Sequence, residues 1–224
     1  MHIPDGFIDL KTVITTGVLS TGGLAVSIFN VKKIFKAKVI AMMGVTAALI
    51  FALQMINFTI PGGTSGHLLG GALVAILLGP FAGSIVLTVV LIVQALVFMD
   101  GGIVALGSNV FNMAICGVLS AYLIYYLLQK ISLKKWLFYT SVAAASWLSV
   151  VFASFMAALE LGISGTYDMG VTVKAMVLVH MVIGVGEAAI TTAIIAFINR
   201  IRPDLIITRQ NQYSDALKST DINK

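Results

Sequence analysis

Long apolar runs, broken by short polar segments, dominate the pattern along this 224-residue chain. These runs predict membrane-spanning helices, because about 20 apolar residues in a helix cross the hydrocarbon core of a bilayer. The expected spans are residues 12–30, 39–56, 67–79, 81–99, 103–128, 136–160 and 173–198. The third span is too short to cross alone, which is typical of a broken helix that lines a protein cavity. We therefore expect an all-α bundle of seven transmembrane helices.

The composition agrees with an integral membrane protein. Hydrophobic residues make up 59% of the chain and charged residues 10%, whereas soluble domains contain about 25% charged residues. Residues 1–202 are expected to form one transmembrane domain, and the polar residues 203–224 a loosely ordered cytoplasmic tail. The single cysteine, Cys116, excludes an intramolecular disulfide.

The net charge of +5 comes from basic clusters beside the apolar spans, so it indicates membrane topology and not nucleic-acid binding. With the N-terminus outside and the C-terminus in the cytoplasm, all of the 14 basic residues except Lys11 and Lys174 lie on the inner side. We expect a multi-pass membrane protein in this orientation. The first residues lack the basic region of a cleaved leader, so a retained N-terminus is expected.

The first two residues carry a compact set of nitrogen donors. The amine of Met1, the peptide nitrogen of His2 and the imidazole Nδ1 of His2 would close a five-membered and a six-membered ring around one metal ion. Three nitrogens in a plane point to Ni(II) or Cu(II). The alternative is an exposed histidine near the N-terminus that has no role.

A second histidine lies in a glycine-rich loop. His67 follows the sequence PGGTSG at the outer start of the short third span, on the same predicted membrane face as His2. Glycines let the loop turn sharply and approach another backbone closely, so His67 can supply a fourth nitrogen. The alternative is a histidine that caps a helix at the interface.

Further polar residues are candidates for supporting the site, because ligating histidines usually donate their other nitrogen to an oxygen atom. Each of them could equally serve in a turn, a cap or helix packing. The candidates are Asp5, Thr64, Ser65, Gln94 and Asn109.

Two other patterns remain open. His180 and Glu187 are seven residues apart and share a helix face, which fits either an ion path or a satisfied polar pair. Small residues at four-residue spacing, Gly44, Ala48 and Ala52, fit a docking face for a partner membrane protein or internal packing. No phosphate-binding G-x-x-x-x-G-K-[ST] sequence occurs, so we do not expect this chain itself to hydrolyse ATP.

The opening MHIPDGF, the loop PGGTSGHLLGGAL and the run VVLIVQALVFMDGGIVALGSNVFNMAICG resemble the NikM/CbiM family. These proteins are the metal-binding membrane (S) components of energy-coupling-factor transporters for nickel and cobalt. The resemblance implies a six-helix core preceded by an extra N-terminal helix. It also implies metal ligation by Met1, His2 and His67. The partners implied are a transmembrane coupling (T) protein, two cytoplasmic ATPases and a small accessory membrane protein.

The sequence thus predicts a metal-capture component and not an enzyme, with Ni(II), or else Co(II), as transported substrate and no organic cofactor. Pro4, Asp5 and the loop resemble the nickel type of the family. One alternative is a stand-alone metal permease or channel that uses His180 and Glu187. Another is an intramembrane metal sensor or hydrolase.

Overall fold

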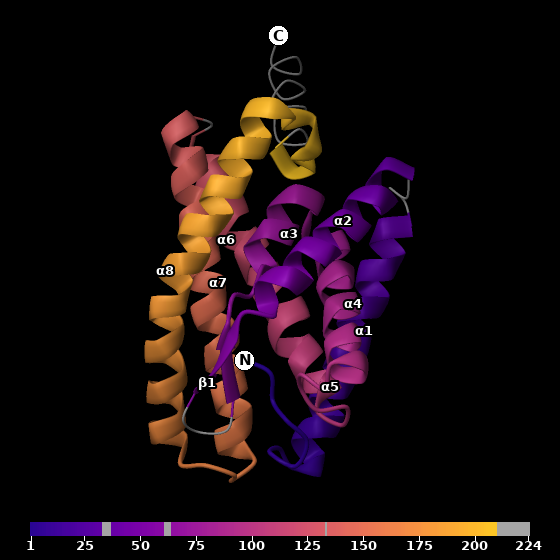
Figure 1. Ribbon diagram of the computed structural model, residues 1–224, viewed down its shortest axis with the longest axis vertical. Helices are drawn as coiled ribbons and strands as arrows, with labels where there is room; N and C mark the ends of the chain where they lie inside the picture. The colour runs from indigo at the N-terminus through magenta and orange to yellow at the C-terminus, as the bar shows by residue number, and fades with distance from the viewer. Residues whose placement is uncertain (33–36, 61–63, 133, 210–224) are drawn as a thin grey trace.

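The computed structural model describes residues 1–32, 37–60, 64–132 and 134–209, without the side chains of 58–60 and 64. Figure 1 shows a bundle of long helices with a small two-stranded hairpin beside them. In chain order the elements are α1 (Leu10–Val31), α2 (Ala37–Gln54), β1 (Asn57–Ile60), β2 (Thr64–His67), α3 (Gly71–Leu78), α4 (Pro80–Val97), α5 (Leu106–Asn109), the π-helix η2 (Val110–Gly117), α6 (Val118–Ile131), α7 (Lys135–Ile163), α8 (Met169–Ile201) and the 3-10 helix η3 (Pro203–Leu205).

Six helical stretches in the described part of the chain are long and apolar enough to cross a membrane. They are α1, α2, α4, the continuous stretch Leu106–Ile131, α7 and α8. The third expected span is instead an eight-residue helix, α3, in which every residue is buried. The expected seven spans are thus six long helices and one short internal helix, because Gly70 and Gly79 end α3 on both sides with positive φ angles.

A two-stranded antiparallel sheet departs from the expected all-α fold. β1 pairs with β2, and Asn57 lies opposite His67 in the register. Backbone polar groups inside a membrane protein need internal partners, and the pairing of the two strands supplies them where the glycine-rich sequence cannot continue a helix. The fold is therefore mostly helical, with a hairpin that carries His67.

A π-helix interrupts the fifth spanning stretch. Residues Val110–Gly117 form η2 between α5 and α6. Asn109 and Asn112, which lie at the start of this irregular stretch, are both buried. π-helical turns are rare and occur often at functional sites. Here the π-helix begins directly after Asn109, which contacts Ile3 of the N-terminal segment.

The chain after α8 folds back onto the bundle. Thr208 donates a hydrogen bond from its hydroxyl to the carbonyl of Ile76 at 2.6 Å, and Ile206 is fully buried. Residues 203–209, which belong to the expected loose tail, are therefore packed. Residues 210–224 lie outside the described residues.

The end of α8 and the start of α2 lie at the same end of the bundle (Figure 1), where Lys38 and Arg202 both pair with Asp204. The small residues of α2, Gly44, Ala48 and Ala52, are all exposed on the surface of this chain. Internal packing, one of the two readings of that pattern, therefore does not account for them.

Replacing Gly70 with alanine should destabilise the protein. Gly70 has a φ of +74°, and a Cβ there would collide with the Ile50 side chain. The left-handed conformation costs about 1–2 kcal/mol for other residues, and overpacking adds roughly 1–3 kcal/mol. The control is Gly165→Ala, at φ +70° in open space. Thermal unfolding in detergent should show a larger fall in Tm for Gly70→Ala, and equal falls would contradict the steric argument.

Candidate metal site

The N-terminal segment folds back into the bundle beside the hairpin (Figure 1). Met1 and Ile3 are fully buried, and His2 is 4% exposed. The Met1 amine donates hydrogen bonds to the backbone carbonyl of Ser65 and, at 3.2 Å, to the Ser65 hydroxyl. The start of the chain therefore lies against β2.

An asparagine holds the segment as a neighbouring strand would. The side chain of Asn109 accepts from the Ile3 N–H at 2.8 Å and donates to the Ile3 carbonyl at 3.0 Å. The same carbonyl also accepts from the N–H of Gly102 at 2.9 Å. Because Asn109 satisfies both backbone groups of one residue, the direction of the chain after His2 is determined.

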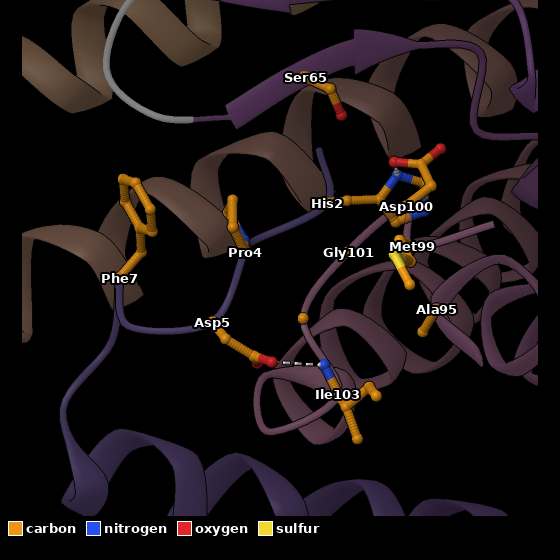
Figure 2. A pocket seen from close by; sticks show the side chains of 11 residues that line it. His2, Pro4, Asp5, Phe7, Ser65, Ala95, Met99, Asp100, Gly101 and Ile103 are labelled. Atoms are coloured by element: carbon orange, nitrogen blue, oxygen red, sulfur yellow. Dashed lines mark hydrogen bonds and ion pairs between the residues drawn. The ribbon is translucent and has the colours of Figure 1, made fainter. Parts of the chain in front are cut away.

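The Asp5 carboxylate attaches the segment to the loop before α5. It accepts the backbone N–H groups of Ile103, Val104 and Ala105 at 3.0, 2.8 and 3.1 Å. Figure 2 shows Asp5 extending toward Ile103. A Cβ at Gly102 would collide with Asp5, so the close approach requires glycine there.

The two histidine rings stack on each other. The ring centroids of His2 and His67 are 4.5 Å apart, at an interplanar angle of 21°. His2 Nδ1 lies 3.1 Å from the carboxylate of Asp100, and its Nε2 lies 3.2 Å from Oε1 of Gln94. Figure 2 shows His2 and Asp100 side by side. Asp100 in turn accepts a hydrogen bond from Asn57 at 3.0 Å.

The hydrogen bonding of His67 determines which of its ring nitrogens can bind a ligand. Nδ1 lies 2.8 Å from the carbonyl oxygen of Leu68, and because a carbonyl only accepts, Nδ1 carries the proton. Nε2 is buried and has no hydrogen-bond partner among the described residues. Its lone pair is therefore available next to the His2 ring.

Burial keeps the nitrogen donors uncharged. It lowers the pKa of the Met1 amine from 8.0 to about 4, although Asp100 acts in the opposite direction. Burial also lowers the pKa of His67 well below its ordinary value and lowers the pKa of His2. Half-burial raises the pKa of Asp100, but the hydrogen bonds with His2 and Asn57 and the nearby positive charges together lower that pKa below its ordinary value. Neutral amine and imidazole groups are the forms that bind metal ions.

Side chains alone do not complete a metal-binding set in the part of the chain that the structure describes. No group of three or more histidine, cysteine, aspartate or glutamate residues converges there. A metal ion bound at the stacked rings would need the N-terminal amine or a backbone nitrogen as well. A cavity of about 650 Å³ borders these groups, and His2, Asp5, Ser65 and Asp100 line part of it (Figure 2).

The structure brings most of the predicted site residues together. Ser65, Gln94 and Asn109 contact the first three residues, and Asp5 anchors the segment that follows. The side chain of Thr64 lies outside the described residues.

The histidine and glutamate of α8 do not join this cluster directly. His180 bonds the Met176 carbonyl, and Glu187 bonds backbone N–H groups after His67. The contact between Asp100 and His2 was missed by sequence reasoning. The carboxylate in Met-Asp-Gly-Gly, at the end of an apolar span, was the available signal.

Six long apolar helices around a buried polar cluster define a multi-pass membrane protein. A model of the CbiM family, described as the cobalt uptake substrate-specific transmembrane region, matches residues 2–205. The chain therefore belongs to the CbiM family, and the resemblance noted from the sequence is confirmed.

Individual relatives agree with this assignment. The chain is 43% identical over 210 residues to a putative fused nickel transport protein NikMN of Archaeoglobus fulgidus, covering 92% of this chain and 68% of that protein. It is 40% identical to a putative metal transport protein of Haloquadratum walsbyi, covering 99% of both chains. A crystal structure of a truncated transition metal transporter matches with a TM-score of 0.84 at 34% identity, covering 89% of this chain and 99% of that one.

Replacing Asn109 with alanine should loosen the N-terminal segment, since the Ile3 N–H loses its partner in a buried place. An unsatisfied buried group costs about 1–3 kcal/mol. The Met1 amine should then react faster with an acylating reagent, as followed by mass spectrometry of the folded protein. Asn199→Ala, at a partly buried asparagine on α8 that contacts Tyr139, is the control. Equal rates in both variants and the parent would count against the role of Asn109.

Acid should weaken the docking of the N-terminus. The pKa of the buried Met1 amine is about 4, against 8.0 ordinarily, so the undocked segment binds more protons between these pH values. Docking is strongest above pH 8 and weakens below it by at most about 1.4 kcal/mol per pH unit. Hydrogen exchange of the Ile3 amide, corrected for its intrinsic rate, should show protection falling from pH 8 toward pH 5. Constant protection would refute the prediction.

Proposed function

We propose that this chain is the substrate-capture component of an importer for divalent nickel or cobalt. The ion binds the Met1 amine, the His2 amide and imidazole nitrogens, and Nε2 of His67. The observation that supports this donor set best is the buried Nε2 of His67, which has no hydrogen-bond partner among the described residues and lies in a ring stacked on His2. The neutral amine of Met1 is buried at the same hairpin.

The arrangement of hydrogen bonds around His2 supports chelation through Nδ1. Gln94 accepts from Nε2, which retains a proton there and leaves Nδ1 as the coordinating nitrogen. The carboxylate of Asp100 lies 3.1 Å from Nδ1, and its negative charge beside that nitrogen favours a bound cation. Binding removes the amide proton of His2, so it releases protons to the solvent.

Four nitrogen donors in a plane favour Ni(II) over metals that prefer oxygen ligands or tetrahedral sites. Nickel is therefore the first candidate, and Co(II) is the second because the matching family model is described as a cobalt uptake region. The resemblance of Pro4, Asp5 and the loop to nickel-type sequences agrees, as does the name of the relative from Archaeoglobus fulgidus, a putative fused nickel transport protein. The ion is cargo, and no organic cofactor is part of this proposal.

The energy for transport comes from other subunits of an energy-coupling-factor complex, because the chain contains no phosphate-binding loop. These are a transmembrane coupling protein and two cytoplasmic ATPases, together with a small accessory membrane protein. The exposed stripe of Gly44, Ala48 and Ala52 on α2 is the candidate docking face. In this proposal the protein lies in the bacterial plasma membrane with the N-terminus outside and the C-terminus in the cytoplasm.

A stand-alone permease that conducts ions along His180 and Glu187 is the second candidate, and the structure disfavours it. Both oxygens of Glu187 accept short hydrogen bonds from the backbone, at Leu69 and Gly70. Glu187 therefore holds the turn after His67, and this role accounts for its burial without an ion path. No contact among the described residues supports an intramembrane sensor or hydrolase.

Adding one residue before Met1 should abolish high-affinity nickel binding, because the amine becomes a peptide nitrogen and leaves the chelate. His2→Ala and His67→Ala each remove one donor. Loss of a residue that hydrogen-bonds a metal ligand already costs roughly 10–100-fold in metal affinity. Loss of a ligand itself should therefore cost at least about 100-fold. Isothermal titration of the purified protein with its native N-terminus measures the effect.

The matched control carries the same extra residue after Lys224. It should bind nickel as the parent does, and circular dichroism should show the same helix content in all variants. Tight, stoichiometric nickel binding by the protein with the extended N-terminus would sink the chelate model. Parallel titration with cobalt compares the two ions.

A further inference from the structure

Side chains from two spanning helices hold the turn that follows His67. The N–H groups of Leu69 and Gly70 donate to the two carboxylate oxygens of Glu187, each at 2.6 Å. The side-chain amide of Gln54 donates to the carbonyl of Leu69 at 2.7 Å. Glu187 lies on α8 and Gln54 at the end of α2, and both are buried. Two consecutive peptide groups are thereby clamped.

The first of these peptide groups also holds the imidazole of His67. Its N–H belongs to Leu69 and donates to Glu187, while its carbonyl belongs to Leu68 and accepts from His67 Nδ1 at 2.8 Å. A trans peptide group is planar, and its N–H and C=O point in opposite directions. The carboxylate at one end therefore determines the direction of the carbonyl at the other end. That carbonyl in turn fixes the rotation and tautomer of the imidazole.

Burying a carboxylate in this position is costly. Glu187 is 2% exposed, and no salt bridge to it occurs among the described residues. An unpaired buried charge is strongly unfavourable, and here two short charge-assisted hydrogen bonds offset that cost. A helix cap for α3 would explain both bonds by itself. It would not explain why the capped peptide group is the one that binds the ring of His67.

We propose that Glu187 is a positioning residue for metal capture, which acts on His67 through the peptide group between Leu68 and Leu69. This proposal rests on the proposed function, in which His67 is a ligand. Metal-binding histidines commonly donate their second nitrogen to a carboxylate or a backbone carbonyl, and here the carboxylate acts through the carbonyl. The hydrogen bonds from Glu187 through this peptide group to His67 hold the proton on Nδ1 of His67 and direct the lone pair of its Nε2 toward the site. They also increase the electron density on the imidazole ring.

Glu187→Gln tests the proposal, because glutamine keeps the shape but presents one acceptor and one donor to two N–H groups. Nickel affinity of the protein with its native N-terminus should fall about 10–100-fold, as for loss of other partners of ligating histidines. The visible absorption band of bound Ni(II) should also shift. Glu160→Gln makes the same change in α7, where the carboxylate contacts Asn112 and not the turn. That control should bind nickel with unchanged affinity and spectrum.

A second measurement reads the tautomer of His67 directly and needs no metal. Nitrogen-15 NMR of the metal-free protein should show the proton of His67 on Nδ1, and Glu187→Gln should give a mixture of tautomers. A parent protein with the proton on Nε2 would overturn the proposal, even if the variant does not fold. So would a folded Glu187→Gln protein with unchanged nickel affinity, or one that loses affinity with the tautomer unchanged. Unchanged nickel binding by His67→Ala would instead refute the proposed function.

Discussion

The burial of the first three residues is the constraint on which the rest of the structure depends. An amine and several peptide groups enter the core of a membrane protein, where each polar group needs an internal partner. The chain meets this need with Ser65 for the amine, Asn109 for both groups of Ile3 and the N–H of Gly102. Those partners come from β2, the end of α5 directly before the π-helix, and the loop after α4. The three irregular parts of the bundle therefore meet at the N-terminus.

The same requirement explains the hairpin. A short run rich in glycine cannot form a full spanning helix, and β1 and β2 satisfy each other's backbone groups. The turn after β2 is then fixed by Glu187 and Gln54 from opposite helices. His67, at the end of β2, is thereby held from its backbone and from its own ring nitrogen. A rigid histidine next to a docked amine is the basis of the proposed chelate.

Desolvation gives the cluster its chemical character. Burial lowers the pKa of the Met1 amine and of both histidines, so the nitrogens are held in the state that a metal ion requires. Asp100 balances this by pairing with His2 at the wall of the cavity. The uncharged state of these nitrogen donors thus results from the buried position of the N-terminal segment, and not from any unusual residue in it.

The sequence by itself determined the membrane class, the long helices, the family and the donor-rich start of the chain. These depend on apolar length and on covalent neighbours, which are local properties. Gln94 and Asn109 could be named as polar residues in apolar spans, but their partners could not. Only the tertiary structure decided that the third span is a buried helix beside a hairpin, that Asp100 contacts His2, and that Glu187 holds the turn after His67. Those contacts join residues about a hundred positions apart, such as Leu69 and Glu187 at a separation of 118, and no local pattern specifies which polar groups must satisfy each other.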